Sequence, residues 1–165
     1  MPQWDDFIWS DHNIENRLNP WKGDGESIVF TNGCFDLIHR GHLEYLSKAS
    51  ELGDRLIIGL NSDSSVQRLK GPVRPIKDEQ TRAALLASLR YVDAVILFYS
   101  DTPESLIHRI RPDVLVKGGD WKKDEIAGAD FVTSNGGTVE TIPYISGQST
   151  TELIERIVEL FQETE

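Results

Sequence analysis

Two histidines three residues apart, His39 and His42, stand where an apolar segment passes through a glycine turn into a helical pattern. The stretch reads SIVFTNGCFDLIHRGHLEYLSKA, from Ser27 to Ala49. Side chains at positions i and i+3 share one face of a helix, so both imidazoles point to the same side of the helix start. A helix that begins after a strand also offers unpaired backbone N–H groups and the positive end of the helix dipole. The stretch therefore predicts an anion site at this turn.

The turn before the histidines contains Thr31, Asn32 and Gly33, and Gly41 keeps the helix start open to close approach. The spacing of these glycines matches neither the G-x-G-x-x-G dinucleotide fingerprint nor the G-x-x-x-x-G-K-[ST] phosphate loop. Neither of those two binding modes is therefore expected here.

Two other interpretations of the histidines stay open on spacing alone. Cys34, Asp36, His39 and His42 carry the ligand atoms of a metal site, although a zinc cage does not explain the glycines of the turn. Alternatively, the two histidines only cap the helix and pack against it.

A basic segment follows in an otherwise acidic chain. From Ser64 to Lys77, SSVQRLKGPVRPIK contains four bases and no acid. We expect this segment to close on phosphates as a clamp. Its loop Arg68–Lys77 should be mobile without ligand, with few residues able to anchor in the core. Lys70 and Arg74 are predicted to contact the transition state. The alternative is a solvated loop with charges placed at random.

Short apolar runs alternate with helical patterns from Ser27 onward. The expected strands are 27–30, 55–60, 94–98, 114–116 and 138–142. The alternation predicts an α/β fold, a Rossmann-like doubly wound five-stranded parallel sheet with helices on both faces. Ligands of such sheets bind beyond the carboxyl ends of the strands. Candidates for binding the acceptor substrate at those ends are Asp36, Asn61, Asp63 and Trp121.

The chain is expected to be one domain, residues 26–165, preceded by an N-terminal arm, residues 1–25. The arm is polar and irregular but contains Trp4, Trp9 and Trp21, and Ile14 and Leu18 are spaced to seat a short helix. We expect the arm to pack on the domain.

Composition limits the classes of partner. The formal net charge is -10, from 27 acids and 17 bases, which opposes binding to nucleic acid or to an anionic membrane surface. The single cysteine, Cys34, suits a reducing compartment. The first residues lack the basic and apolar regions of a signal peptide, and AVILFY is far shorter than a membrane span. We therefore expect a cytoplasmic protein.

Several motifs resemble a known family. GCFDLIHRGH together with GQSTTELI is similar to the nucleotidyltransferase superfamily, which carries an H-x-G-H motif and a second motif rich in serine and threonine. The longer stretches FTNGCFDLIHRGH, LKGPVRPI and PDVLVKGGDW resemble one branch, the D-glycero-D-manno-heptose 1-phosphate adenylyltransferase domain of the bifunctional heptose kinase/adenylyltransferase. The resemblance runs from about Ile28 to the C-terminus.

The resemblance implies roles for the residues that match these motifs. His39 and His42 would bind the triphosphate and stabilise charge on the α-phosphate and the leaving pyrophosphate. The nucleotide-binding residues that it implies are Thr31, Asn32, Gly33, Cys34, Phe35, Gly41, Arg82, Lys117, Gly118, Gly119, Asp120, Ser149, Thr150 and Thr151. Arg82 stands where related transferases carry a phosphate-binding arginine, and 117–120 would form the nucleobase pocket. An ordinary Gly-Gly turn and a helix N-cap explain parts of the last two segments without a ligand.

The implied reaction is attack of a sugar 1-phosphate on the α-phosphorus of ATP, with Mg²⁺ bound to the ATP and no metal held by the protein alone. A homodimer and a separate sugar kinase are implied as well. One departure is Tyr144, because the similar glycerol-phosphate cytidylyltransferases carry arginine just after the proline of this region. A cytidylyltransferase acting on a polyol phosphate remains an alternative, as does a non-catalytic nucleotide-binding module. A fragment of a class I aminoacyl-tRNA synthetase shares the H-x-G-H motif, but the acidic net charge opposes it.

Overall fold

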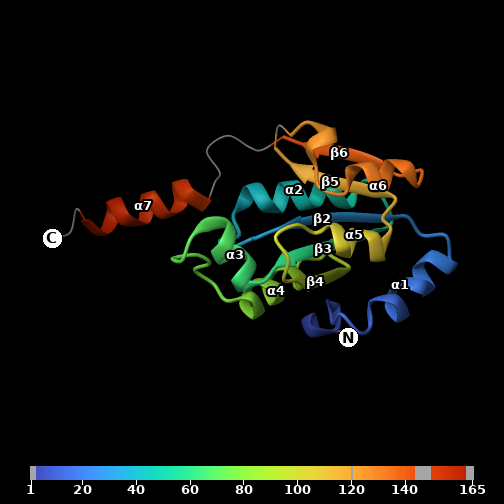
Figure 1. The fold of residues 1–165 in the computed structure, drawn as a ribbon. Helices are drawn as coiled ribbons and strands as arrows, with labels where there is room; N and C mark the ends of the chain where they lie inside the picture. Colours follow the sequence, from blue (N-terminus) through green and yellow to red (C-terminus); the bar gives the residue numbers. More distant parts are fainter. Residues whose placement is uncertain (1–2, 120, 144–149, 163–165) are drawn as a thin grey trace.

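The computed structural model describes residues 3–119, 121–143 and 150–162 and shows an α/β fold built on one sheet (Figure 1). The sheet has six strands in the order β1-β4-β3-β2-β5-β6, and every pair of neighbours is parallel. The strands are β1 Ile8–Trp9, β2 Ile28–Gly33, β3 Arg55–Asn61, β4 Ala94–Phe98, β5 Val114–Gly118 and β6 Thr138–Ile142. The Rossmann-like class is therefore confirmed, and the count of five strands is wrong.

Helices cover both faces of the sheet. The α-helices are α1 Ile14–Gly23, α2 Arg40–Ser50, α3 Asp63–Lys70, α4 Glu79–Ala87, α5 Glu104–Ile110, α6 Ala129–Ser134 and α7 Thr150–Gln162, and the 3₁₀ turns are η1 Trp4–Phe7 and η2 Lys123–Glu125. Buried side chains of α2 and α4 belong to one core cluster, whereas those of α1, α5 and α6 belong to the other. None of the described helices has the length and apolar character of a membrane span.

The sixth strand comes from the N-terminal arm. Ile8 and Trp9 pair with Val95 and Ile96 of β4, which extends the sheet by a two-residue edge strand. So short a strand gives no alternation that a sequence pattern can reveal. Trp9 is buried, and its ring centroid lies 4.8 Å from that of Trp21. The division of the chain between residues 25 and 26 stays a prediction.

The basic segment begins as a helix rather than as a loop. The Ser62 hydroxyl caps α3 by accepting a hydrogen bond from the Ser65 amide, and Val66 on the inner face of this helix is fully buried. Gly71, with φ 97°, ends the helix in a conformation that L-residues rarely adopt. Asp78 caps α4 as its sequence position predicts, because its Oδ1 accepts from the Thr81 amide at 2.7 Å.

The carboxyl edge of the sheet has a switch point beside β2. The chain runs from β2 through β3 to β4 on one side and then crosses to β5 and β6 on the other. A crevice beyond the strand ends is the usual ligand site of such a sheet. The strands β2 and β3 that line it are buried along almost their whole length.

We predict that Gly59→Ala lowers the free energy of unfolding by about 1–3 kcal/mol, because overpacking a core strains it. A Cβ atom at Gly59 would lie 2.7 Å from the ring of Phe30, which is itself fully buried. Urea denaturation measures the change. Gly23→Ala is the matched control, since a Cβ there meets nothing within 4 Å. Equal stability of the two variants would contradict the packing seen on β3.

Candidate functional site

A cavity of about 850 Å³ opens at the carboxyl edge of the sheet. It lies beyond the ends of β2, β3 and β5 and is bounded by the starts of α2 and α7 and the end of α3. The predicted site residues that line it are Asn32, Gly33, Cys34, Phe35, Asp36, His39, Gly41, His42, Asn61, Lys70, Arg74, Lys117, Gly118, Trp121, Thr150 and Thr151. Residues far apart in the sequence thus meet in one place.

Other predicted site residues lie elsewhere. Thr31, Asp63, Arg82 and Gly119 are near the cavity but are not part of its lining. Thr31 is buried, and its hydroxyl lies 2.5 Å from the hydroxyl of Tyr45. The predicted nucleotide ligands Asp120 and Ser149, and the departure at Tyr144, lie outside the described residues.

The two histidines stand at the start of α2 with their ring centroids 4.0 Å apart. The backbone N–H of His39 donates to Nδ1 of His42 at 3.4 Å. A neutral imidazole that accepts at Nδ1 carries its proton on Nε2, so His42 presents an N–H donor. Within the described part of the chain, the buried Nδ1 of His39 has no hydrogen-bond partner. An unsatisfied buried polar atom of this kind marks a place for a ligand or water.

Both imidazoles are held in the neutral form. Burial, and then the neighbouring His39, lower the pKa of His42 to about 4. Burial also lowers the pKa of His39, while Glu152 at the start of α7 opposes that shift. The Phe35 ring contributes to this environment, since its centroid lies 5.3 Å from that of His42. At neutral pH the pair can therefore act as hydrogen-bond donors without adding net charge.

The segment after α3 is anchored by Asp36. Arg74 Nε donates to Oδ2 of Asp36 at 2.6 Å, and Oδ1 accepts from the amides of Ile76 and Lys77 at 2.8 and 3.0 Å. Burial raises the pKa of Asp36, but these backbone and guanidinium donors hold it below its usual range. The expectation of few anchors in this segment is therefore wrong.

Lys70 and Lys117 bring positive charge to the lining of the cavity, which also contains four carboxylates. Lys117 Nζ donates to Oδ1 of Asn32 at 3.2 Å, and burial lowers its pKa, with nearby Lys70 acting in the same direction. Burial raises the pKa of the Cys34 thiol, although Lys70, Arg82, Lys117 and Arg74 oppose that shift. A buried neutral thiol is a poor nucleophile, so the cations are left to attract an anion.

Arg82 occupies a different place from the one predicted for a phosphate ligand. Its side chain is fully buried, and it donates to the backbone carbonyls of Cys34, Asn61 and Lys77 and to the carboxylate of Asp63. In this structure it therefore joins the ends of β2 and β3 to the start of α3. Asp63, predicted to bind substrate, is its ion-pair partner at 2.7 Å.

Sequence reasoning missed several residues of the lining. They are Tyr45, Leu69, Asp101, Thr102, Pro103, Glu125, Ile126, Ala127 and Glu152. Asp101 and Thr102 follow β4, so the strand-end rule that pointed to Asn61 could have found them. No comparable signal marks Glu125 and its neighbours, which η2 brings to the edge.

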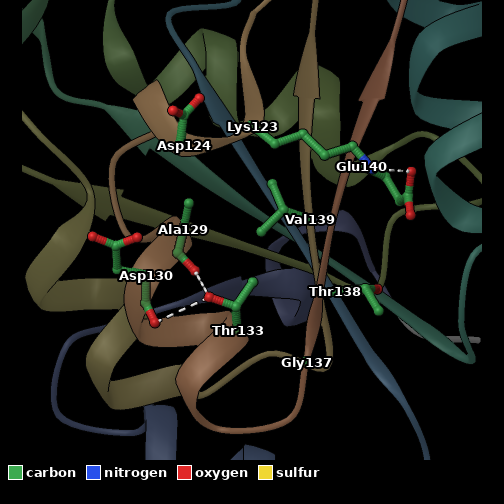
Figure 2. A pocket seen from close by; sticks show the side chains of 9 residues that line it. All are labelled: Lys123, Asp124, Ala129, Asp130, Thr133, Gly137, Thr138, Val139 and Glu140. Atoms are coloured by element: carbon green, nitrogen blue, oxygen red, sulfur yellow. Dashed lines mark hydrogen bonds and ion pairs between the residues drawn. The ribbon is translucent and has the colours of Figure 1, made fainter.

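A second, smaller hollow of about 460 Å³ lies between η2, α6 and β6 (Figure 2). Lys123 crosses it to pair with Glu140 at 3.0 Å, and Thr133 bonds to backbone carbonyls of its own helix. None of the predicted site residues lines this hollow. Most of the predicted site residues line the larger cavity instead.

Comparisons with known proteins show the family of the chain. The sequence profile of the cytidylyltransferase-like family matches residues 30–156. The bifunctional protein HldE of Syntrophotalea carbinolica is 48% identical over 161 residues, covering 98% of this chain and 33% of that protein. The protein of the same name from Alcanivorax borkumensis is 53% identical over 152 residues, covering 92% of this chain and 32% of that protein. The chain thus spans about a third of the length of these curated relatives.

A solved structure shares the fold. The crystal structure of the lipopolysaccharide core biosynthesis protein from Thermoplasma volcanium matches with a TM-score of 0.61 and 32% identity. The match covers 75% of this chain and 100% of that chain. Together, these matches confirm the family resemblance read from the motifs.

The lowered pKa of His42 predicts a dependence of stability on pH. The folded-state pKa of about 4 lies below the usual histidine value of 6.5, so the unfolded chain binds more protons between these values. The free energy of unfolding should therefore fall as the pH drops from about 6.5 to 4, by about 2–3 kcal/mol from this group. Urea denaturation at several pH values measures it.

The variant His42→Gln should lose this part of the slope, whereas His12→Gln, which replaces an exposed histidine outside the cavity, should keep it. If the free energy of unfolding changes with pH in the same way in wild type and in His42→Gln, His42 is not held neutral by the fold.

Proposed function

Because this chain belongs to the cytidylyltransferase-like family, we propose that it transfers AMP from ATP to a sugar 1-phosphate, giving an ADP-sugar and pyrophosphate. The acceptor that we propose is D-glycero-β-D-manno-heptose 1-phosphate. The motif resemblance to the heptose branch supports this choice, as do the names of the relatives, bifunctional protein HldE and lipopolysaccharide core biosynthesis protein.

The observation that carries the proposal is the meeting of donors and cations in one cavity. His39, His42, Lys70, Arg74 and Lys117 all line it. The starts of two helices, α2 and α7, open onto the same space. Two polyanions that must react with each other need this kind of charge and donor arrangement.

The chemical step needs no covalent intermediate. An oxygen of the acceptor phosphate forms a bond to the α-phosphorus, and the bond from that phosphorus to the bridging oxygen of the β-phosphate breaks. Pyrophosphate leaves with the electron pair of that bond. The attacking phosphate is already anionic, so the site requires no strong general base. Catalysis then consists of aligning the two phosphates and stabilising the charge that develops.

We assign the roles within the site as follows. The Nε2–H of neutral His42 donates to an oxygen of the triphosphate, and His39 acts beside it. Lys70 and Arg74 approach the reacting phosphates from the end of α3 and the segment after it. The glycine edges of β2 and β5, at Gly33 and Gly118, leave room for the nucleotide.

Mg²⁺ enters this reaction as part of the substrate MgATP. Among the described residues, no group of three His, Cys, Asp or Glu side chains is arranged to hold a metal ion. Asp36 already accepts from Arg74 and two amides. Mg²⁺ commonly binds through substrate phosphates and water with few protein ligands, which fits this site. The homodimer, the separate sugar kinase and the cytoplasmic location stay predictions.

We predict that ATP with the heptose 1-phosphate is preferred over CTP with glycerol 3-phosphate by roughly 10–100-fold in kcat/KM, because a mismatched base leaves buried polar groups unpaired. Pyrophosphate release for each nucleotide with each acceptor measures it. Preference for CTP with every acceptor would contradict the adenylyl assignment, and nucleotide binding without turnover would favour a non-catalytic module.

We also predict that His39→Ala and His42→Ala each lower kcat by ~10²-fold or more, the usual effect of losing a preorganised donor to developing charge. Circular dichroism should show that both variants remain folded. His12→Ala, outside the cavity, is the control and should retain the wild-type rate. Wild-type turnover in either folded variant of the pair would remove the role that we assign.

A further inference from the structure

We propose that Asp101 and Thr102, just beyond β4, together with Asn61 at the end of β3, form the subsite that recognises the hydroxyl groups of the acceptor sugar. This inference rests on the proposed function and adds to it the residues that select the acceptor. All three residues line the cavity, and only Asn61 was expected there from the sequence.

The topology divides the cavity into two halves. Gly33, Lys117 and Gly118 stand at the ends of β2 and β5, the two strands that flank the switch point. Asn61 stands at the end of β3 and Asp101 just beyond the end of β4, farther along the sheet from the switch point. The glycine-lined half suits a flat nucleobase, because backbone can approach it closely. The acceptor must lie beside the α-phosphate, which leaves it the half over β3 and β4.

The side chains of this half are polar and held in position. Arg68 Nε donates to Oδ1 of Asp101 at 2.7 Å, and the same guanidinium donates to the carbonyl of Tyr99. Neither interaction uses Oδ2 of Asp101, and no described residue bonds to that atom. A carboxylate fixed through one oxygen leaves the other to accept from a hydroxyl group.

A chain of hydrogen bonds orients Asn61 against the same loop. Its amide nitrogen donates to the Ser65 hydroxyl at 2.9 Å, and that hydroxyl donates to the carbonyl of Ser100 at 2.9 Å. The Ser100 hydroxyl in turn donates to the carbonyl of Thr102 at 2.7 Å. Asn61 is almost fully buried, yet its Oδ1 accepts no bond from the described residues. That oxygen is therefore available as a second acceptor for hydroxyl groups.

The charges separate the two ends of the acceptor. A carboxylate at Asp101 repels a phosphate but accepts well from neutral hydroxyl groups. Lys70, at the end of α3, lines the cavity and has no ion-pair partner in the described part of the chain. The phosphate of the acceptor is thus directed toward Lys70 and Arg74, and its sugar toward Asp101, Thr102 and Asn61.

The test is steady-state kinetics of pyrophosphate release with ATP and the heptose 1-phosphate, in wild type and in Asp101→Ala and Thr102→Val. Asp101→Ala should raise the KM for the sugar phosphate by roughly 10–100-fold, because a hydrogen bond to a charged group is lost. Thr102→Val should raise it by ~10-fold, because a hydrogen bond to a neutral group is lost. The KM for ATP should stay within about twofold, since the nucleotide lies in the other half.

Asp11→Ala is the matched control, because it breaks a comparable exposed ion pair, with Arg109, outside the cavity. It should leave both KM values unchanged. Acceptor KM values within about twofold of wild type in both cavity variants would overturn the subsite and leave Asp101–Arg68 a surface ion pair. Equal increases in both KM values would also overturn it. A wild-type protein that turns over no sugar 1-phosphate would instead overturn the proposed function, and this inference with it.

Discussion

The hydrogen bonds and the ion pair of the buried Arg82 guanidinium hold the site together. A charge without water is costly unless it is paired and fully hydrogen-bonded. Arg82 meets this requirement by donating to three backbone carbonyls and to the Asp63 carboxylate. The carbonyls belong to the end of β2, the end of β3 and the segment before α4, and Asp63 stands at the start of α3. These four segments are therefore fixed relative to one another. The turn that precedes the histidines and the segment that carries Arg74 are positioned by the same buried cation, without contact between Arg82 and the cavity.

The site contains two kinds of polar group: neutral hydrogen-bond donors and cations. The histidines are kept neutral by burial and serve as directional donors, whereas Lys70, Lys117 and Arg74 supply charge. Charged imidazoles beside these lysines would repel them and one another, because unscreened charges at a few ångströms interact strongly. Donors aimed by the helix start cost no reorganisation when charge develops on the phosphates. Phe35, whose φ of 46° is unusual for a residue with a side chain, places its ring beside His42 and helps to keep water away.

Much of this arrangement follows from sequence patterns, and the exceptions have physical reasons. Alternating apolar runs and helical periods were enough to predict the five longer strands, since each is long enough to show its pattern. The edge strand Ile8–Trp9 is too short for that, and α3 was hidden by a basic composition that resembles a loop. The histidines could be singled out because their spacing is local, whereas the turn predicted at Thr31, Asn32 and Gly33 is the end of strand β2. Asp36 and Arg82 were predicted to bind substrate and nucleotide, but their partners within the protein were not predictable, since those contacts join segments 38 and 48 residues apart.

The acidic composition of the chain affects which of its cations stay unpaired. The chain has 27 acids against 17 bases, so carboxylates are available to pair with arginines across the surface. Arg55 forms ion pairs with Glu26 and Asp93, and Arg109 forms ion pairs with Asp11 and Glu15. Such pairs contribute little stability each, but they neutralise cations that would otherwise attract anions to the wrong place. Lys70 and Lys117 have no carboxylate partner among the described residues, and both face the cavity. Lys70 and Lys117 can therefore attract a polyanion to the carboxyl edge of the sheet, beside the start of α2.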